Sequence, residues 1–339
     1  MPTALQQRAL GALAGVAIGD AMGMPTQTLT REDIAACYGE IDGFRDSVPQ
    51  QPVSAGLKAG TITDDTEQSI MLARHLLARG GGIDQHAWAE ELLAWERDTH
   101  ARGVSDLLGP STKRAIAALR NGVPVTETGR QGTTNGAAMR IVPVAIATPP
   151  APLDILIDTV EESCRLTHST SEAIGAAAAV AAAVSLAIEG AGLEDALTFA
   201  LRAAAAGEGR GQPAKGGSIS ERIGHALALS EGRRGRQAAF DIAARIGTSV
   251  SALQSIPMAF AVVRLTGGDP WATALISAQI GDDTDTIGAI ACGIAGACAG
   301  FAAIPGAAWN LVQHVNGLDL APIVDGLLRI RAQRGGQSA

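Results

Sequence analysis

Aromatic residues are scarce in this chain of 339 residues, which contains five Phe, four Trp and one Tyr. Charged residues make up only 18% of it, and 26 Lys and Arg against 34 Asp and Glu give a net charge of −8. Because no basic run occurs, a groove for nucleic acid is not expected. The 47% of hydrophobic residues excludes a disordered chain, since this much apolar surface can form a core.

Cysteine is also rare, with four residues that form no Cys-x-x-Cys pair and no zinc-ligand pattern with histidine. They therefore suggest neither a disulfide framework nor a zinc site. The first fifteen residues lack a basic segment followed by an apolar signal core. A cytoplasmic protein is the resulting expectation, and its state as monomer or dimer stays open.

Alanine and glycine are abundant, whereas runs of β-branched and aromatic residues are few. Alanine is the best helix former, and small residues let helices approach closely. We therefore predict an all-α protein with a single domain over residues 1–339. The predicted helices are Leu5–Gly19, Arg31–Tyr38, Asp65–Arg79, Gln85–Asp98, Pro110–Arg120, Leu153–Leu166, Ser171–Gly190, Leu193–Ala206, Ile219–Glu231, Arg236–Ile246, Ala252–Thr266, Pro270–Ile280, Asp285–Gly300 and Ala321–Arg334.

Two long uncharged stretches, Ile287–Trp309 and Ala173–Ile188, raise the question of a membrane span. Both are dominated by alanine and glycine, and the first contains Pro305. We expect helices buried inside a bundle and no membrane association. Two glycine-rich segments are predicted to be irregular: Gly129–Arg140 as a loop, and Gly207–Ser218 as a linker or mobile loop.

Two acidic motifs carry the chemistry. Thr63-Asp64-Asp65-Thr66 opens a predicted helix, and Asp282-Asp283-Thr284-Asp285-Thr286 opens another more than two hundred residues later. One acidic helix start is ordinary, and Asp64 with Glu67 has the pattern of a capping box. Adjacent carboxylates flanked by hydroxyls repel one another unless a cation lies between them.

Carboxylate and hydroxyl oxygens without histidine or cysteine are hard ligands, which select Mg²⁺, Mn²⁺ or Ca²⁺ over zinc. Asp64, Asp65, Asp283 and Asp285 supply four negative charges, enough to balance two divalent cations. The two motifs therefore predict a binuclear site that could activate water or polarise a substrate oxygen.

Several segments together resemble the ADP-ribosylglycohydrolase family. They are the opening helix Gly11–Gly23, with its Gly-Asp-Ala-Met-Gly ending, Thr63–Thr66, Asn135–Arg140, Thr167-His168 and Gly281–Gly288. The match keeps the family's order and spans about residues 8–300. The resemblance implies an all-α orthogonal helix bundle with two Mg²⁺ or Mn²⁺ ions that cleaves the N- or O-glycosidic bond between ADP-ribose and an acceptor.

The resemblance also implies site residues. The metal ligands would be Thr63, Asp64, Asp65, Asp283, Asp285 and Thr286. The substrate contacts would be Gln27, Gly132, Asn135, Gly136, Met139, Arg140 and His168. Arg140 could pair with a phosphate or with a nearby acid.

One departure from the family concerns Gln27, because members commonly carry glutamate at this position. An amide cannot exchange a proton as an acid or base, although it can orient water. The role of base would then fall to Asp283 or Asp65, or the substrate would differ. Asp282, where the family more often has glycine, adds a further negative charge, and Asp98 is another carboxylate that could reach the cleft.

The leading hypothesis is a metal-dependent hydrolase that releases ADP-ribose, or a related ribosyl group, from a protein side chain or a small conjugate. Two alternatives stay open: an N-glycosidase acting on a small nucleoside-like riboside, and a non-catalytic ADP-ribose-binding protein. A purely structural protein would require both acidic motifs to be helix caps only.

Overall fold

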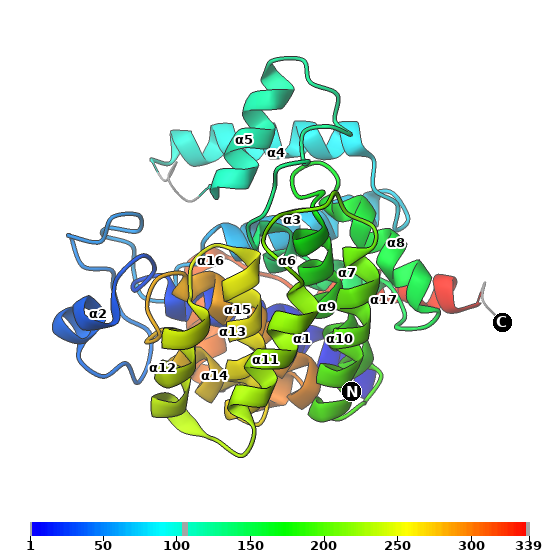
Figure 1. Ribbon diagram of the computed structural model, residues 1–339. Coiled ribbons are helices and arrows are strands. Elements are labelled where there is room, and N and C mark those ends of the chain that lie inside the picture. Colours follow the sequence, from blue (N-terminus) through cyan, green and yellow to red (C-terminus); the bar gives the residue numbers. More distant parts are fainter. Residues whose placement is uncertain (1, 104–107, 337–339) are drawn as a thin grey trace.

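The computed structural model describes residues 2–103 and 108–336, and their fold is all-α, as the composition predicts (Figure 1). No strand occurs in this part of the chain, which has only two isolated β-bridges. The helices are α1 (Ala4–Gly23), α2 (Arg31–Tyr38), α3 (Asp64–Ala78), α4 (Gln85–Ala101), α5 (Pro110–Arg120), α6 (Gly136–Met139), α7 (Val142–Ala147), α8 (Leu153–Cys164), α9 (Ser171–Ile188), α10 (Leu193–Glu208), α11 (Ile219–Ser230), α12 (Gly235–Ile246), α13 (Ala252–Leu265), α14 (Pro270–Ser277), α15 (Thr284–Ala299), α16 (Gly306–Asn316) and α17 (Ala321–Gly336), with a 3₁₀ turn at Phe301–Ala303.

Helices α1 and α15 pack with their backbones almost in contact. Gly11, Gly15, Gly19 and Gly23 recur every four residues along one face of α1, and a Cβ atom at any of them would lie 2.0–2.4 Å from a backbone atom of α15. Only glycine permits this approach, because any side chain would push the helices apart. The pairing sets the C-terminal end of α1 beside the N-terminal end of α15.

The centre of the bundle is filled by small side chains, as the shortage of aromatic residues requires. Helix α9 is alanine-rich and almost wholly buried by its neighbours. It is long and apolar enough to cross a membrane, but 89% of its apolar window is covered by the rest of the molecule. The other apolar stretch is not one helix, since α15 ends at Ala299 and α16 begins at Gly306.

Helices α4 and α5 project from one end of the bundle, at the top of Figure 1, and the segment that carries α2 lies at one side. Trp95 of α4 and Ile116 of α5 form a small hydrophobic cluster of their own with Leu108. These two peripheral parts flank the end of the bundle at which α3 and α15 begin.

Three sequence predictions need correction. Helices α7 and α16 were not predicted, and α6 forms inside the predicted loop Gly129–Arg140. The predicted linker Gly207–Ser218 begins inside α10, and its remainder is fastened to the start of α9. There Ser171 donates its backbone N–H to the carbonyl of Gln212 at 2.8 Å, and Gln212 donates to that of Ser169 at 2.8 Å. These two hydrogen bonds hold Gln212 against the residues that lead into α9.

Candidate active site

The N-terminus of helix α3 is capped by a side chain from another helix. Its own N-cap residue, Thr63, makes no side-chain capping bond. Instead, the buried carboxylate of Asp20, on α1, accepts hydrogen bonds from the backbone N–H of Thr63 at 3.0 Å and of Thr66 at 3.1 Å. It also accepts from both threonine hydroxyls. Asp20 thereby fixes the first turn of α3, which carries Asp64 and Asp65.

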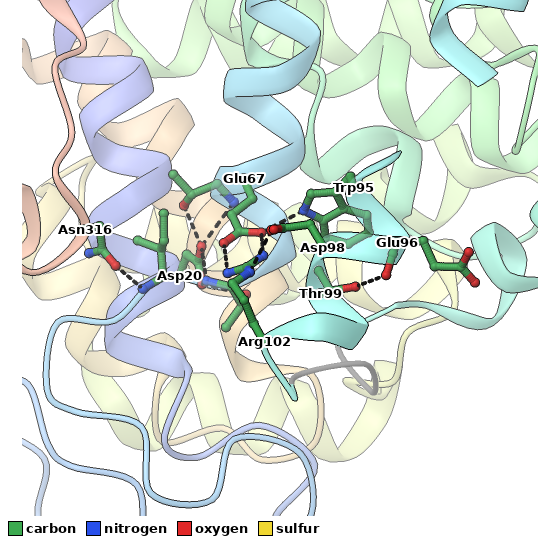
Figure 2. Close-up of polar contacts among 11 residues, drawn as sticks. Asp20, Glu67, Trp95, Glu96, Asp98, Thr99, Arg102 and Asn316 are labelled. Carbon is green, nitrogen blue, oxygen red and sulfur yellow. Dashed lines mark hydrogen bonds and ion pairs between the residues drawn. The ribbon is translucent and has the colours of Figure 1, made fainter. Parts of the chain in front are cut away.

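The capping box predicted from Asp64 and Glu67 does not form. The carboxylate of Glu67 points the other way, toward α4, where it accepts from the indole N–H of Trp95 at 2.7 Å and from both terminal nitrogens of Arg102 at 2.8 Å (Figure 2). Arg102 also pairs with Asp98 at 2.8 Å. Asp98 thus lines a separate cavity of about 410 Å³ and is not part of the acidic site.

Helix α15 supplies the second set of carboxylates. Asp283 is its N-cap residue and accepts a short hydrogen bond from the side-chain amide of Asn135, which also donates to the hydroxyl of Ser255 at 3.0 Å. Asp285 follows in the first turn and is buried. The exposed Asp282 has a left-handed backbone with φ of 63°, the conformation that favours the glycine more usual in the family.

Asp65, in the first acidic motif, also contacts the second motif. Its Oδ2 is 3.4 Å from the hydroxyl of Thr63 and 3.3 Å from the hydroxyl of Thr286, so α3 and α15 meet at this carboxylate. Its Oδ1 is buried and has no hydrogen-bond partner among residues 2–103 and 108–336. A buried carboxylate oxygen without a partner is costly, and a cation would satisfy it.

The acidic groups destabilise one another's charged forms. Burial first, and then repulsion by neighbouring carboxylates, raises the pKa of Asp64, Asp65 and Asp285 well above the usual range. Burial likewise raises the pKa of Asp20 and of Asp283 to about 6. Each of these shifts marks a place where positive charge would be favourable.

The predicted ligands fit a hard divalent cation in their chemistry, since all of them are oxygen donors. Within residues 2–103 and 108–336, no group of three or more His, Cys, Asp and Glu side chains is arranged to hold a metal ion as it stands. The structure nevertheless brings the predicted oxygen donors together at the starts of α3 and α15, with an unpartnered oxygen among them. These donors are Thr63, Asp64, Asp65, Asp283, Asp285 and Thr286.

A cavity of about 150 Å³ opens above these groups. It is lined by Gln27, Thr28, Val53, Asp64, Leu108, Gly109, Pro110, Thr112, Thr134, Asn135, Gly136, Met139, Val250, Asp283, Asp285 and Thr286. Four of the seven predicted substrate residues are in this wall: Gln27, Asn135, Gly136 and Met139. The cavity is smaller than the roughly 300–1,000 Å³ typical of sites that enclose a drug-sized ligand.

The other three predicted contacts lie behind the wall. Arg140 is 1% exposed, and it donates to the side-chain carbonyl of Gln68 at 2.8 Å and to the hydroxyl of Thr167 at 2.6 Å. His168 is fully buried. A Cβ atom on Gly132 would lie 2.0 Å from the carbonyl oxygen of Thr167, so this glycine permits close packing of the two chain segments.

Sequence reasoning assigned no role to two residues of the site. Asp20 belongs to the motif that carries the family resemblance, and it directly follows Gly19 of the glycine repeat that brings this part of α1 beside α15. Thr134 was passed over between Gly132 and Asn135, although it lines the cavity. Nothing in its local pattern distinguishes it from Thr133.

Comparison with known proteins shows the family of this chain. Residues 1–337 match the ADP-ribosylglycohydrolase family. The chain is 35% identical over 332 residues to YegU of Escherichia coli (strain K12), covering 97% of this chain and 98% of that protein. It is 36% identical over 169 residues to ADP-ribosyl-[dinitrogen reductase] glycohydrolase of Rhodospirillum rubrum, covering 49% and 52% of the two chains. A solved structure described as an ADP-ribosylglycohydrolase-related protein complex superposes with a TM-score of 0.69 at 25% identity, covering 96% of this chain and 98% of that one. The protein therefore belongs to the ADP-ribosylglycohydrolase family, whose members are enzymes of the glycohydrolase type.

Proposed function

We propose that this protein is a divalent-cation-dependent hydrolase that cleaves the glycosidic bond between ADP-ribose, or a related ribosyl group, and an acceptor. The observation that carries the proposal is the meeting of two acidic helix starts at Asp65, whose buried Oδ1 has no hydrogen-bond partner among the described residues, beside a cavity lined by Asp64, Asp283 and Asp285. Family membership over nearly the whole chain supports the reaction class. An ADP-ribosylated protein or a small ribosyl conjugate in the cytoplasm would be the partner.

In this proposal, the hydroxyl and carboxylate oxygens of α3 and α15 hold two Mg²⁺ or Mn²⁺ ions, which would supply Lewis-acid activation of water. The chain's own contribution is placement. Asp20 fixes the first turn of α3, and Asn135 holds Asp283 in one orientation. Asp283 and Asp65 are the candidates to orient an attacking water and take its proton, since glycoside hydrolysis needs a carboxylate for this step.

Gln27 and the cavity's volume bear on the substrate. The amide of Gln27 lines the cavity and is 7% exposed, and its nitrogen lies 3.4 Å from the carbonyl of Met24. Because an amide exchanges no proton, this position can only orient a ligand or water. The 150 Å³ cavity favours a ribosyl group as the enclosed part, with the rest of a larger substrate beyond its rim.

The test is a turnover panel. ADP-ribosyl-arginine, ADP-ribosyl-serine and nucleosides would be incubated with the protein and with Gln27→Glu, in Mn²⁺, in Mg²⁺ and in chelator. Metal-dependent release of ADP-ribose from one of the first two supports the proposal. Turnover of nucleosides only would identify a riboside N-glycosidase, and binding of ADP-ribose without any turnover would identify a binding protein.

A further inference from the structure

A chain of four side chains runs from the protein interior to the cavity wall. Arg140 donates to the hydroxyl of Thr167 at 2.6 Å, and this hydroxyl lies 2.7 Å from Nδ1 of His168. On the other side of the ring, Nε2 of His168 lies 2.9 Å from the hydroxyl of Thr134. Arg140, Thr167 and His168 are buried, and Thr134 alone lines the cavity.

The direction of the hydrogen bonds follows from the chemistry of Arg140. A guanidinium group only donates, so the oxygen of Thr167 is an acceptor toward Arg140. The single hydrogen of that hydroxyl is left for His168 Nδ1, its other partner. If Nδ1 carried a proton instead, the hydroxyl hydrogen of Thr167 would be buried without an acceptor among the described residues, at the cost of an unmade hydrogen bond.

His168 is held neutral, which makes the two ring nitrogens distinct. Burial first, and then the positive charges of Arg140 and Arg114, lower the pKa of His168 well below its usual value. In a neutral imidazole one nitrogen donates and the other accepts. With Nδ1 accepting from Thr167, Nε2 carries the hydrogen and donates to the hydroxyl oxygen of Thr134.

The hydroxyl hydrogen of Thr134 is then directed away from His168. In the part of the chain that the structure describes, His168 is the only hydrogen-bond partner of this hydroxyl. The residue also lies next to Asn135, whose side chain holds Asp283. Because Thr134 lines the cavity that Asp64, Asp283 and Asp285 also line, this hydroxyl hydrogen is available to a ligand there.

We propose that Arg140, through Thr167 and His168, fixes the polarity of the Thr134 hydroxyl so that it donates a hydrogen bond to an acceptor oxygen of the ligand. The matching ligand group is an anionic or carbonyl-like oxygen, such as a phosphate oxygen. The identity of this ligand as an ADP-ribosyl group rests on the function proposed above. The direction of the hydrogen bonds from Arg140 to Thr134 does not depend on that function. Thr134 is thus a specificity-determining contact, and the other three are positioning residues.

The direction of the hydrogen bonds through His168 can be tested without a ligand and without measuring activity. Nitrogen NMR of the ¹⁵N-histidine-labelled protein, with the signals of His168 assigned by their absence in His168→Asn, reports which ring nitrogen carries the hydrogen. We expect an unprotonated Nδ1 and a protonated Nε2. Thr167→Val, which removes the donor to Nδ1, should reduce this preference, and Thr167→Ser should keep it. A protonated Nδ1 in the wild type would overturn the proposal.

The contact is tested by calorimetric binding of ADP-ribose in the presence of Mg²⁺. Thr134→Val should weaken binding about tenfold or more, the effect of losing a hydrogen bond to a charged group, and Thr134→Ser should restore it. Equal affinity of Thr134→Val and the wild type would overturn the proposed contact. Failure of the wild type to bind ADP-ribose would instead reject the proposed function, and the NMR result would still decide the polarity.

Discussion

The carboxylate of Asp20 accepts a hydrogen bond from the backbone N–H of Thr66, 46 positions away in the chain, at 3.1 Å. Asp20 thereby caps the N-terminus of α3, a role that the N-cap side chain of the same helix normally has. The glycine face of α1 makes this possible, because it brings Asp20 to the point where α3 and α15 begin. Helix packing and the placement of the acidic site therefore have one cause.

The first prediction concerns this cap. Asp20→Ala leaves the N–H groups of Thr63 and Thr66 buried without their acceptor, so the free energy of unfolding should fall by about 2–4 kcal/mol. Urea denaturation would measure it. Asp319→Ala, which removes an exposed carboxylate, is the control and should change stability by less than about 0.5 kcal/mol. Equal effects of the two substitutions would contradict the capping role.

The second prediction concerns the glycine face. A Cβ atom on Gly19 would lie 2.0 Å from the carbonyl oxygen of Gly288, so Gly19→Ala must push α1 from α15 and should cost about 1–3 kcal/mol or more. A Cβ atom on Gly306, at the start of α16, meets nothing within 4 Å. Gly306→Ala should therefore leave the thermal unfolding midpoint nearly unchanged. If Gly19→Ala were as stable as Gly306→Ala, the two helices would not be in backbone contact.

The third prediction concerns cation binding. Mg²⁺ or Mn²⁺ added to chelator-treated protein should raise the unfolding temperature, because a ligand at a hundred times its Kd stabilises the folded state by about 2.7 kcal/mol. Asp65→Asn and Asp285→Asn should reduce this shift strongly while the far-ultraviolet circular dichroism stays helical. Asp98→Asn, on the other side of α3, should keep it. An unchanged shift in Asp65→Asn would place the cation elsewhere.

The fourth prediction concerns pH. The pKa of His168 is lowered in the folded state, so the unfolded chain binds a proton more tightly than the folded one. The stability contributed by neutral His168 is therefore present above the unfolded-state pKa of about 6.5 and is lost as the pH falls below it, by about 1.4 kcal/mol per pH unit. Unfolding measured between pH 7 and pH 5 should show a shallower decline in His168→Gln. Parallel curves for the two proteins would show that folding does not lower the pKa of His168.

Much of the helical architecture could be predicted because its signals are local. Helix α5 begins and ends at the predicted residues, since Pro110 opens it and Asn121-Gly122 closes it. Helix α16 was missed because its residues continue an apolar run that sequence alone does not divide at Gly300 and Pro305. The short helices α6 and α7 were missed because their packing against α9, and not their own propensity, stabilises them.

The acidic residues of the site could be predicted because the sequence itself shows carboxylates at the starts of two predicted helices. The resemblance also placed Arg140 and His168 near the cleft. It did not show whether these residues line the cavity or lie behind the residues that line it. That distinction depends on the hydrogen bond between His168 and Thr134, which joins segments 34 residues apart. The cap by Asp20 was equally hidden, because it depends on how closely α1 packs.

The central claim is that the acidic cluster around Asp65 makes this protein a cation-dependent glycohydrolase. The most direct test measures the rate of ADP-ribose release from ADP-ribosyl-arginine and ADP-ribosyl-serine by the wild type and Asp65→Ala, each with Mn²⁺ and with chelator. The account predicts release by the wild type in Mn²⁺ only, and none above background by Asp65→Ala. Equal rates with chelator, or full turnover by Asp65→Ala, would contradict it.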